Sequence, residues 1–91
     1  MELSEAIRKR INNLKEEQKY TLHGLSLMAG VTDSTLDSFM KHKSKSINAK
    51  TLLHVCEGFQ ISLEEFFTDP LFDENAKEVK KMAQNKKTTH K

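Results

Sequence analysis

The chain has no tryptophan, one proline, three glycines and a single cysteine, Cys56. One cysteine cannot form an internal disulfide, and this fits a reducing, cytosolic setting. So little glycine and proline argues against a sandwich or barrel, which needs several turn clusters. No apolar run approaches the ~20 residues of a membrane span, and the N-terminus lacks the pattern of a signal peptide. We therefore expect a small cytoplasmic protein with no membrane partner.

Charge is distributed unevenly along the 91 residues, although the formal net charge is only +2. Residues 1–50 carry nine Lys and Arg against six Asp and Glu. Residues 51–74 contain six acids and no Lys or Arg, whereas residues 75–91 contain six lysines and one glutamate. A chain polarised in this way can present a basic side to a polyanion. Because segregated charge also arises by chance, this pattern alone decides little.

Apolar residues at helical spacing predict five short helices, and no segment has the alternation of a strand. The inward face of the first helix, for which Ser4 is an available cap, consists of Leu3, Ile7, Ile11 and Leu14. Each later helix follows a residue type that caps helix N-termini well, namely Thr21, Thr32, Asn48 and Ser62. The predicted fold class is therefore all-α, a compact bundle of five helices.

The predicted helices end at recognisable residues. Gly30 ends the second helix, because glycine tolerates the left-handed conformation that closes a helix. Residues 58–60 end the fourth helix, and Asp69 and Pro70 end the fifth. We divide the chain into a domain of residues 1–74 and a basic tail of residues 75–91. We expect the tail to be flexible, because its few apolar residues bury little surface.

The second and third helices, joined by a tight turn at residues 30–31, have a specific physical use. The third helix, residues 33–41, turns short polar side chains outward while its apolar side chains face the core. The major groove of DNA is ~12 Å wide and admits one helix, which needs short hydrogen-bonding side chains in its first turns. This pattern predicts base contacts from Ser34, Thr35, Asp37 and Ser38.

Basic and amide groups beside such a helix bind the DNA backbone. The start of the second helix, near Leu22 and His23, offers backbone N–H groups to a phosphate. The following loop carries Lys41, Lys43 and Lys45. These lysines also suit an ordinary solvated loop, but next to the helix pair we favour phosphate contact. The Lys-rich tail is either a solubilising segment or an arm that follows the DNA backbone.

Two runs resemble a known family: TLHGLSLMAGVTDSTL at residues 21–36 and TLLHVCEGFQISLEEFF at residues 51–67. They are similar to the lambda-repressor-like (Cro/repressor, XRE-type) helix-turn-helix family. The resemblance implies a five-helix bundle and a phage or bacterial transcriptional regulator, usually one that binds a palindromic operator as a dimer. It places the family's base-reading positions on Asp33, Ser34, Thr35 and Ser38. It places the phosphate contacts near Thr21, Leu22, Lys41, Lys43 and Lys45.

The chain departs from the family pattern at several positions. Many members have glycine at the position of Gln60, and a left-handed Gln60 costs about 1 kcal/mol relative to glycine. In some members a Glu at the position of Met40 pairs with an Arg at that of Arg10, and that pair cannot form here. Many members have Gln or Arg at the position of Asp33. These departures concern the base contacts more than the fold.

The two acids of the third helix, Asp33 and Asp37, repel phosphate, so each needs an explanation. Either carboxylate can accept a hydrogen bond from the N4 amino group of cytosine. Asp33 can instead be a first-turn acid that the helix dipole favours. We favour this second interpretation for Asp33, and for Asp37 both interpretations stay open.

No pattern in the chain indicates catalysis. Cys56 lies on the inward face of the fourth helix as a small core hydrophobe. The four histidines lack the spacing of metal ligands, and no nucleophile–base pair or phosphate-binding glycine loop is present. We expect no enzyme activity, no metal, no cofactor and no small-molecule ligand.

Two functions remain. The first is a sequence-specific transcriptional regulator, in the role of repressor, that binds double-stranded operator DNA as a homodimer and associates with the nucleoid. The second is a protein-interaction module on the same fold, such as an antitoxin, anti-repressor or adaptor, with weak or no operator binding. Three features favour the second: the two acids of the third helix, the pair Leu27 and Met28, expected to be partly exposed, and the pair Leu71 and Phe72. Around the fifth helix, a further group of apolar residues forms either a dimer interface or a face that packs on its own bundle: Leu63, Phe67, Leu71 and Phe72.

Overall fold

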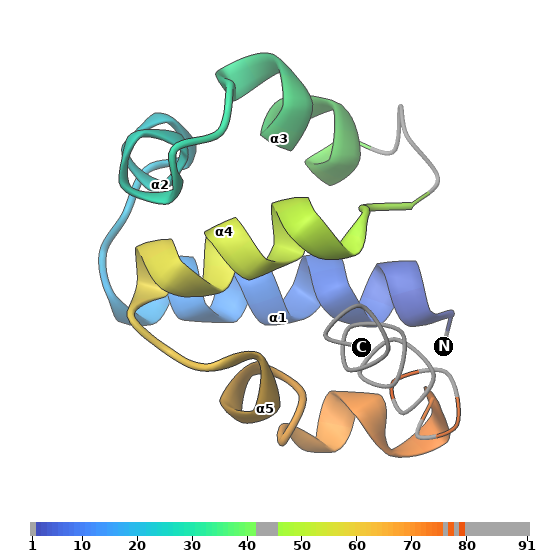
Figure 1. Ribbon diagram of the computed structural model, residues 1–91. Coiled ribbons are helices and arrows are strands. Elements are labelled where there is room, and N and C mark those ends of the chain that lie inside the picture. Colours follow the sequence, from blue (N-terminus) through green and yellow to red (C-terminus); the bar gives the residue numbers. More distant parts are fainter. Residues whose placement is uncertain (1, 42–45, 76, 78, 80–91) are drawn as a thin grey trace, which may run out of the picture.

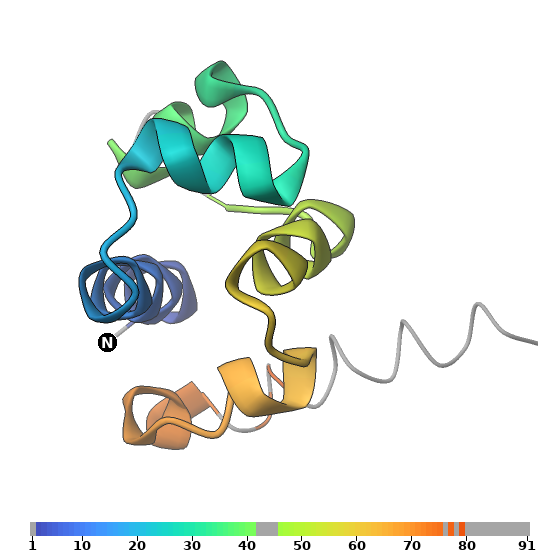
Figure 2. The same ribbon diagram turned by 90° about the vertical axis from the view of Figure 1, so that its left-hand side faces the viewer.

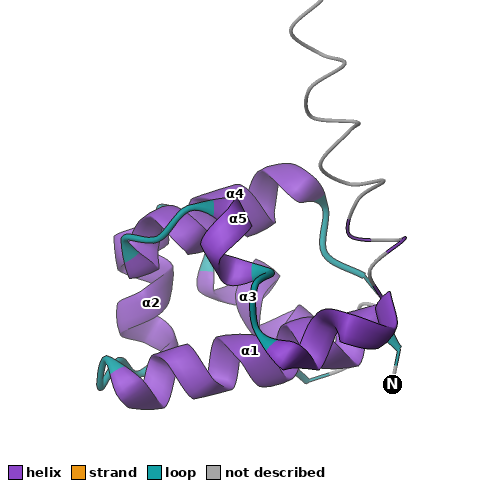
Figure 3. Cartoon of the chain, turned by 90° about the horizontal axis from the view of Figure 1, so that it is seen from below, coloured by secondary structure: helices purple, strands orange, loops and turns teal. Residues whose placement is uncertain are grey.

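The computed structural model describes residues 2–41, 46–75, 77 and 79 of the chain. The elements are α1 (Leu3–Glu17), α2 (Leu22–Ala29), α3 (Asp33–Met40), α4 (Ala49–Phe59), α5 (Leu63–Phe66) and a 3₁₀ helix, Pro70–Asn75 (Figure 1). Over these residues the chain forms helices and loops and no strand (Figure 3). The predicted all-α bundle of five α-helices is confirmed.

Four of the five helices begin at the predicted caps. The side chains of these caps each accept a hydrogen bond from a backbone N–H three residues further on; they are Thr21, Thr32, Asn48 and Ser62. The prediction that Ser4 caps α1 is wrong. Helix α1 begins one residue before Ser4, with Glu2 as N-cap and no side-chain hydrogen bond there. Leu3, the first residue of the helix, packs its side chain against the core.

Left-handed residues close two helices. Gly30, with φ of 71°, closes α2 as predicted. Gln60, with φ of 62°, closes α4, which confirms the left-handed conformation expected at this non-glycine position. Lys19, in the turn between α1 and α2, has φ of 60° and was not predicted.

Gly58 does not end α4, because the helix continues through it to Phe59. Its lack of a side chain allows two helices to approach each other closely. A Cβ atom at this position would lie 3.0 Å from the backbone nitrogen of Ala29, the last residue of α2. Glycine therefore lets α4 pack directly on the end of α2, the first helix of the helix-turn-helix.

The elements lie in three layers (Figures 1 and 2). Helices α2 and α3 form one end of the molecule, α1 and α4 form the middle, and α5 with the 3₁₀ helix forms the other end. All three layers contribute side chains to one core, including the fully buried Ile11, Leu25, Leu36, Leu52 and Phe66. Cys56 is also fully buried in this core, as predicted. The layering leaves the outer side of α2 and α3 uncovered by any other described helix.

Helix α5 is shorter than predicted. It ends at Phe66, and the chain then continues into the 3₁₀ helix. Phe72 of that helix is buried, with its ring centroid 5.7 Å from that of Phe66 and 4.8 Å from that of Phe67. Phe72 therefore packs on its own bundle, which is the second of the two alternatives for this residue. Leu63, Phe67 and Leu71 pack against the same core and are partly buried.

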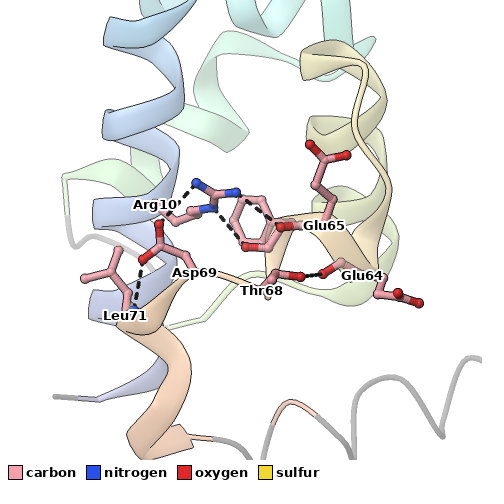
Figure 4. Close-up of polar contacts among 7 residues, drawn as sticks. Arg10, Glu64, Glu65, Thr68, Asp69 and Leu71 are labelled. Carbon is pink, nitrogen blue, oxygen red and sulfur yellow. Dashed lines mark hydrogen bonds and ion pairs between the residues drawn. The ribbon is translucent and has the colours of Figure 1, made fainter.

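Arg10 joins α1 to the end of α5 (Figure 4). Its guanidinium group donates hydrogen bonds to the carbonyl oxygens of Phe66, at 2.9 Å, and Glu65, at 3.2 Å. It also pairs with the carboxylate of Asp69 at 3.3 Å. Because position 40 is a methionine, Arg10 has no acid there to pair with, and it binds the C-terminal end of α5.

The C-terminal part of the chain is described only in part. Val79 packs, partly buried, against the core. Most of the predicted basic tail, residues 76, 78 and 80–91, lies outside the described residues, so the division after residue 74 stays a prediction. No helix in the described ranges is long and apolar enough to cross a membrane.

Candidate nucleic-acid interface

Helices α2 and α3 are joined by a tight turn that backbone hydrogen bonds hold. The N–H of Val31 donates to the carbonyl of Ser26 at 3.1 Å, and that of Gly30 donates to Leu27 at 3.3 Å. The inner faces of the two helices meet in the core through Leu25 and Leu36, both fully buried. The outer faces are thereby fixed relative to each other, as docking in a DNA groove requires.

Arg8 of α1 fixes the far end of α3, a contact that no pattern in the sequence predicts. Its side chain is buried, and its Nε donates to the carbonyl oxygen of Phe39 at 2.6 Å. The guanidinium carbon lies 4.5 Å from the centroid of the Phe39 ring, and the terminal nitrogen pairs with Glu5 at 2.6 Å. A cation at the C-terminal end of a helix is electrostatically favourable. The only local signal in the sequence is the i, i+3 pair of Glu5 and Arg8.

The five predicted base-reading residues occupy the first two turns of α3. Asp33, Ser34 and Thr35 form its exposed first turn. Asp37 and Ser38 follow one turn later and are half-buried. The first turn therefore offers its side chains to a partner more fully than the second.

Both acids of α3 have cationic or hydrogen-bonding partners within the chain. Nδ1 of His23 lies 2.6 Å from Oδ2 of Asp33, and Nζ of Lys41 lies 3.2 Å from Oδ1 of Asp37. The hydrogen bond with His23 lowers the pKa of Asp33 the most. Desolvation opposes this effect, and the Ser26 hydroxyl and the charge of His23 lower the pKa further, so that the net shift is downward. Asp33 is therefore ionised at neutral pH. These contacts offset part of the repulsion that the two acids would exert on phosphate.

The hydroxyl groups of α3 differ in whether they have a hydrogen-bonding partner. The Thr35 hydroxyl lies 2.7 Å from that of Thr32, the N-cap, and is held there. Ser34 and Ser38 have no hydrogen-bonding partner for their side chains within the part of the chain that the structure describes. These two hydroxyls are the groups of α3 most available to the edges of bases.

A shallow hollow of about 340 Å³ lies where α2 and α3 begin. It brings predicted phosphate-binding residues together with predicted base-reading ones, and its lining comprises Leu22, His23, Asp33, Ser34 and Asp37. The two groups of predicted residues, ten positions apart in the sequence, thus form one surface.

The structure describes some of the predicted phosphate-binding groups but not all of them. Thr21 accepts a hydrogen bond from Gly24 N–H at 3.0 Å, so its hydroxyl serves the helix as a cap. The N–H groups of Leu22 and His23, in the first turn of α2, precede the first residue that an intrahelical hydrogen bond can reach. Lys41 is exposed directly after α3, whereas Lys43 and Lys45 lie outside the described residues.

The described residues bring together no group of three or more His, Cys, Asp or Glu side chains that could hold a metal ion. In comparisons with known proteins, a family model described as a Cro/C1-type HTH DNA-binding domain matches residues 10–70. No curated protein and no solved structure matches the chain. The matched range contains α2, α3 and every residue that lines the hollow.

Proposed function

Because the chain belongs to the Cro/C1-type helix-turn-helix family of DNA-binding domains, we propose that it is a sequence-specific transcriptional repressor. Membership confirms the family resemblance found in the sequence. It also confirms that the chain is not an enzyme, since the family is one of DNA-binding domains. What remains to be proposed is how this chain docks, in which oligomeric state, and with what effect on transcription.

We propose that α3 enters the major groove with its first turn leading. The observation that carries this proposal is the exposed edge of that turn, where the Ser34 side chain has no partner among the described residues, next to the start of α2. In this arrangement Ser34 and Ser38 contact base edges, and the N–H groups of Leu22 and His23 bind a phosphate. Lys41, Lys43 and Lys45, which follow α3 in the sequence, bind the DNA backbone.

We further propose that the protein acts as a homodimer on a palindromic operator, within the cytoplasm and on the nucleoid. Recognition helices of a twofold dimer read half-sites about one helical turn apart. A single short α3 offers few base contacts, so two copies supply the specificity that one copy lacks.

The test is a gel shift with the DNA upstream of the protein's own gene, at two salt concentrations. Replacing Lys43 and Lys45 together by alanine is expected to weaken binding to every duplex and to reduce the salt slope by about two. Replacing Ser34 or Ser38 by alanine is expected to change the preference among duplexes instead.

The matched control replaces Lys9 and Lys15, both on α1 and outside α2 and α3, by alanine. This variant removes the same charge, and its salt slope is expected to stay close to that of the wild type. If the Lys43/Lys45 variant behaves like this control, the lysines do not bind phosphate and the proposed docking is wrong.

A second candidate function is a protein-interaction module that retains the fold. The observation that favours it is the exposure of two adjacent apolar side chains at the end of α2, Leu27 at 69% and Met28 at 53%. If this second function is correct, the wild-type protein binds no duplex even at low salt. On size-exclusion chromatography it then elutes as a self-associated species, and the charge-introducing variant Leu27→Glu disperses that species.

A further inference from the structure

One contact joins the starts of the two helices of the helix-turn-helix. His23, in the first turn of α2, and Asp33, the first residue of α3, lie 2.6 Å apart through Nδ1 and Oδ2. Both side chains remain open to solvent, 67% and 58% exposed, and both line the hollow described above. The contact is therefore accessible to a ligand that approaches α2 and α3 together.

The chemistry of this contact fixes the role of each ring nitrogen of His23. An ionised carboxylate only accepts hydrogen bonds, so Nδ1 carries a proton and donates it to Asp33. The remaining nitrogen, Nε2, accepts hydrogen bonds when the ring is neutral and donates one when the ring is protonated. A phosphate oxygen requires a donor, so it selects the protonated ring. Asp33 stabilises that cation from its other side.

On the basis of the proposed function, we propose that Asp33 reads no base and is a positioning residue for His23, whose protonated ring binds a DNA phosphate through Nε2. Asp33 belongs to α3 by sequence, but its contacts are with α2. An acid held in this way has less freedom to turn toward a cytosine than an unpaired one.

The charges around His23 support this assignment. The charged groups that share the hollow with it are Asp33 and Asp37, both from α3, and Asp37 pairs with Lys41. Helix α2 itself contains no other charged residue. Helix α4, which packs on α2, lines no part of the hollow, and its His54 pairs with its own Glu57 at 3.2 Å. Asp33 is therefore the acid that governs the protonated ring.

The proposal is tested with a double-mutant cycle on a duplex recovered from a random DNA pool by the wild-type protein. The variants are His23→Gln, Asp33→Asn and both together, with His54→Gln as the control that removes a histidine–acid pair elsewhere. Binding of each protein to the recovered duplex and to an unrelated duplex of equal length is measured at several pH values between about pH 6 and pH 8, the range in which histidines titrate. Thermal unfolding of each variant reports on the fold.

We expect the wild type and His54→Gln to bind about tenfold more tightly at the acid end of the range, the size of one charge-assisted hydrogen bond. His23→Gln is expected to lose this pH dependence and to reduce the salt slope by about one. Asp33→Asn is expected to weaken binding to both duplexes by a similar factor while leaving the preferred sequence unchanged. The double variant should bind no more weakly than His23→Gln alone.

Three results overturn the proposal while leaving DNA binding intact: a wild type that binds equally well across the pH range, additive effects of the two substitutions, or an Asp33→Asn variant that prefers a different base. The last of these assigns Asp33 to base reading. A wild type that recovers no duplex at all overturns the proposed function, and this inference with it.

Discussion

Two residues at the end of α4, Gly58 and Gln60, have backbone requirements opposite to what their identities suggest. Gly58 has ordinary helical geometry and is needed because a side chain would collide with Ala29. Gln60 is left-handed, a conformation that glycine adopts at little cost. Side chains from the turn between α1 and α2 hold this end of α4. Gln18 donates to the carbonyl of Phe59 at 3.1 Å, and Tyr20 donates to that of Gly58 at 3.3 Å.

Replacing Gln60 by glycine is expected to raise the free energy of unfolding by about 1 kcal/mol, because glycine removes the strain of the left-handed backbone. The measurement is chemical denaturation. Gln60→Ala is the matched control, since it removes the same side chain but keeps the Cβ atom and the strain. Equal stabilities for the two variants would show that Gln60 is not strained.

At this scale the sequence predicted what is local and missed what is not. The caps Thr32 and Ser62 are recognisable because their hydrogen bonds reach only three residues along the chain. Gly58 has no such signal, because its neighbour Ala29 is far away in sequence. For this reason a glycine near the end of a helical pattern is easily mistaken for part of the helix end, although here the C-cap is Gln60.

At the scale of elements, α1 holds the two ends of the molecule with two arginines that lie two residues apart. Arg8 binds the C-terminal end of α3, and Arg10 binds the C-terminal end of α5. Both contacts satisfy backbone carbonyls that a helix end leaves unpaired. Neither was predictable from spacing, because the partner carbonyls are 31 and 56 residues away. Arg8 therefore connects the helix that carries the proposed base contacts to the middle layer.

Arg8→Ala and Arg10→Ala are expected to destabilise the fold by similar amounts, about 2 kcal/mol, because each leaves a carbonyl without its charged donor. Their effects on function should differ. Amide hydrogen exchange should quicken in α3 for Arg8→Ala and in α5 for Arg10→Ala, and only the Arg8 variant should weaken DNA binding at a temperature where both are folded. Equal losses of DNA binding would contradict a specific role of Arg8 in holding α3.

At the scale of the whole molecule, acidic residues gather at the end opposite α2 and α3. Glu64 and Glu65 belong to α5, and Asp73 and Glu74 to the 3₁₀ helix, the layer farthest from α3 in Figures 1 and 2. The acids of α3 itself are paired, Asp33 with His23 and Asp37 with Lys41. A polyanion is therefore repelled least where α2 and α3 lie. The layering therefore turns the uneven charge distribution along the sequence into an acidic end that lies opposite α2 and α3.

Selection of bound duplexes from a random DNA pool, run in parallel with the wild type and Ser34→Ala, tests the central claim most directly. If α3 docks by its first turn, the wild type enriches a motif of two related half-sites whose centres lie about one helical turn apart. Ser34→Ala then enriches a motif that has relaxed or changed at one position in each half-site. Recovery of sequences no different from the starting pool, under conditions where the protein binds DNA, would contradict sequence-specific recognition by α3.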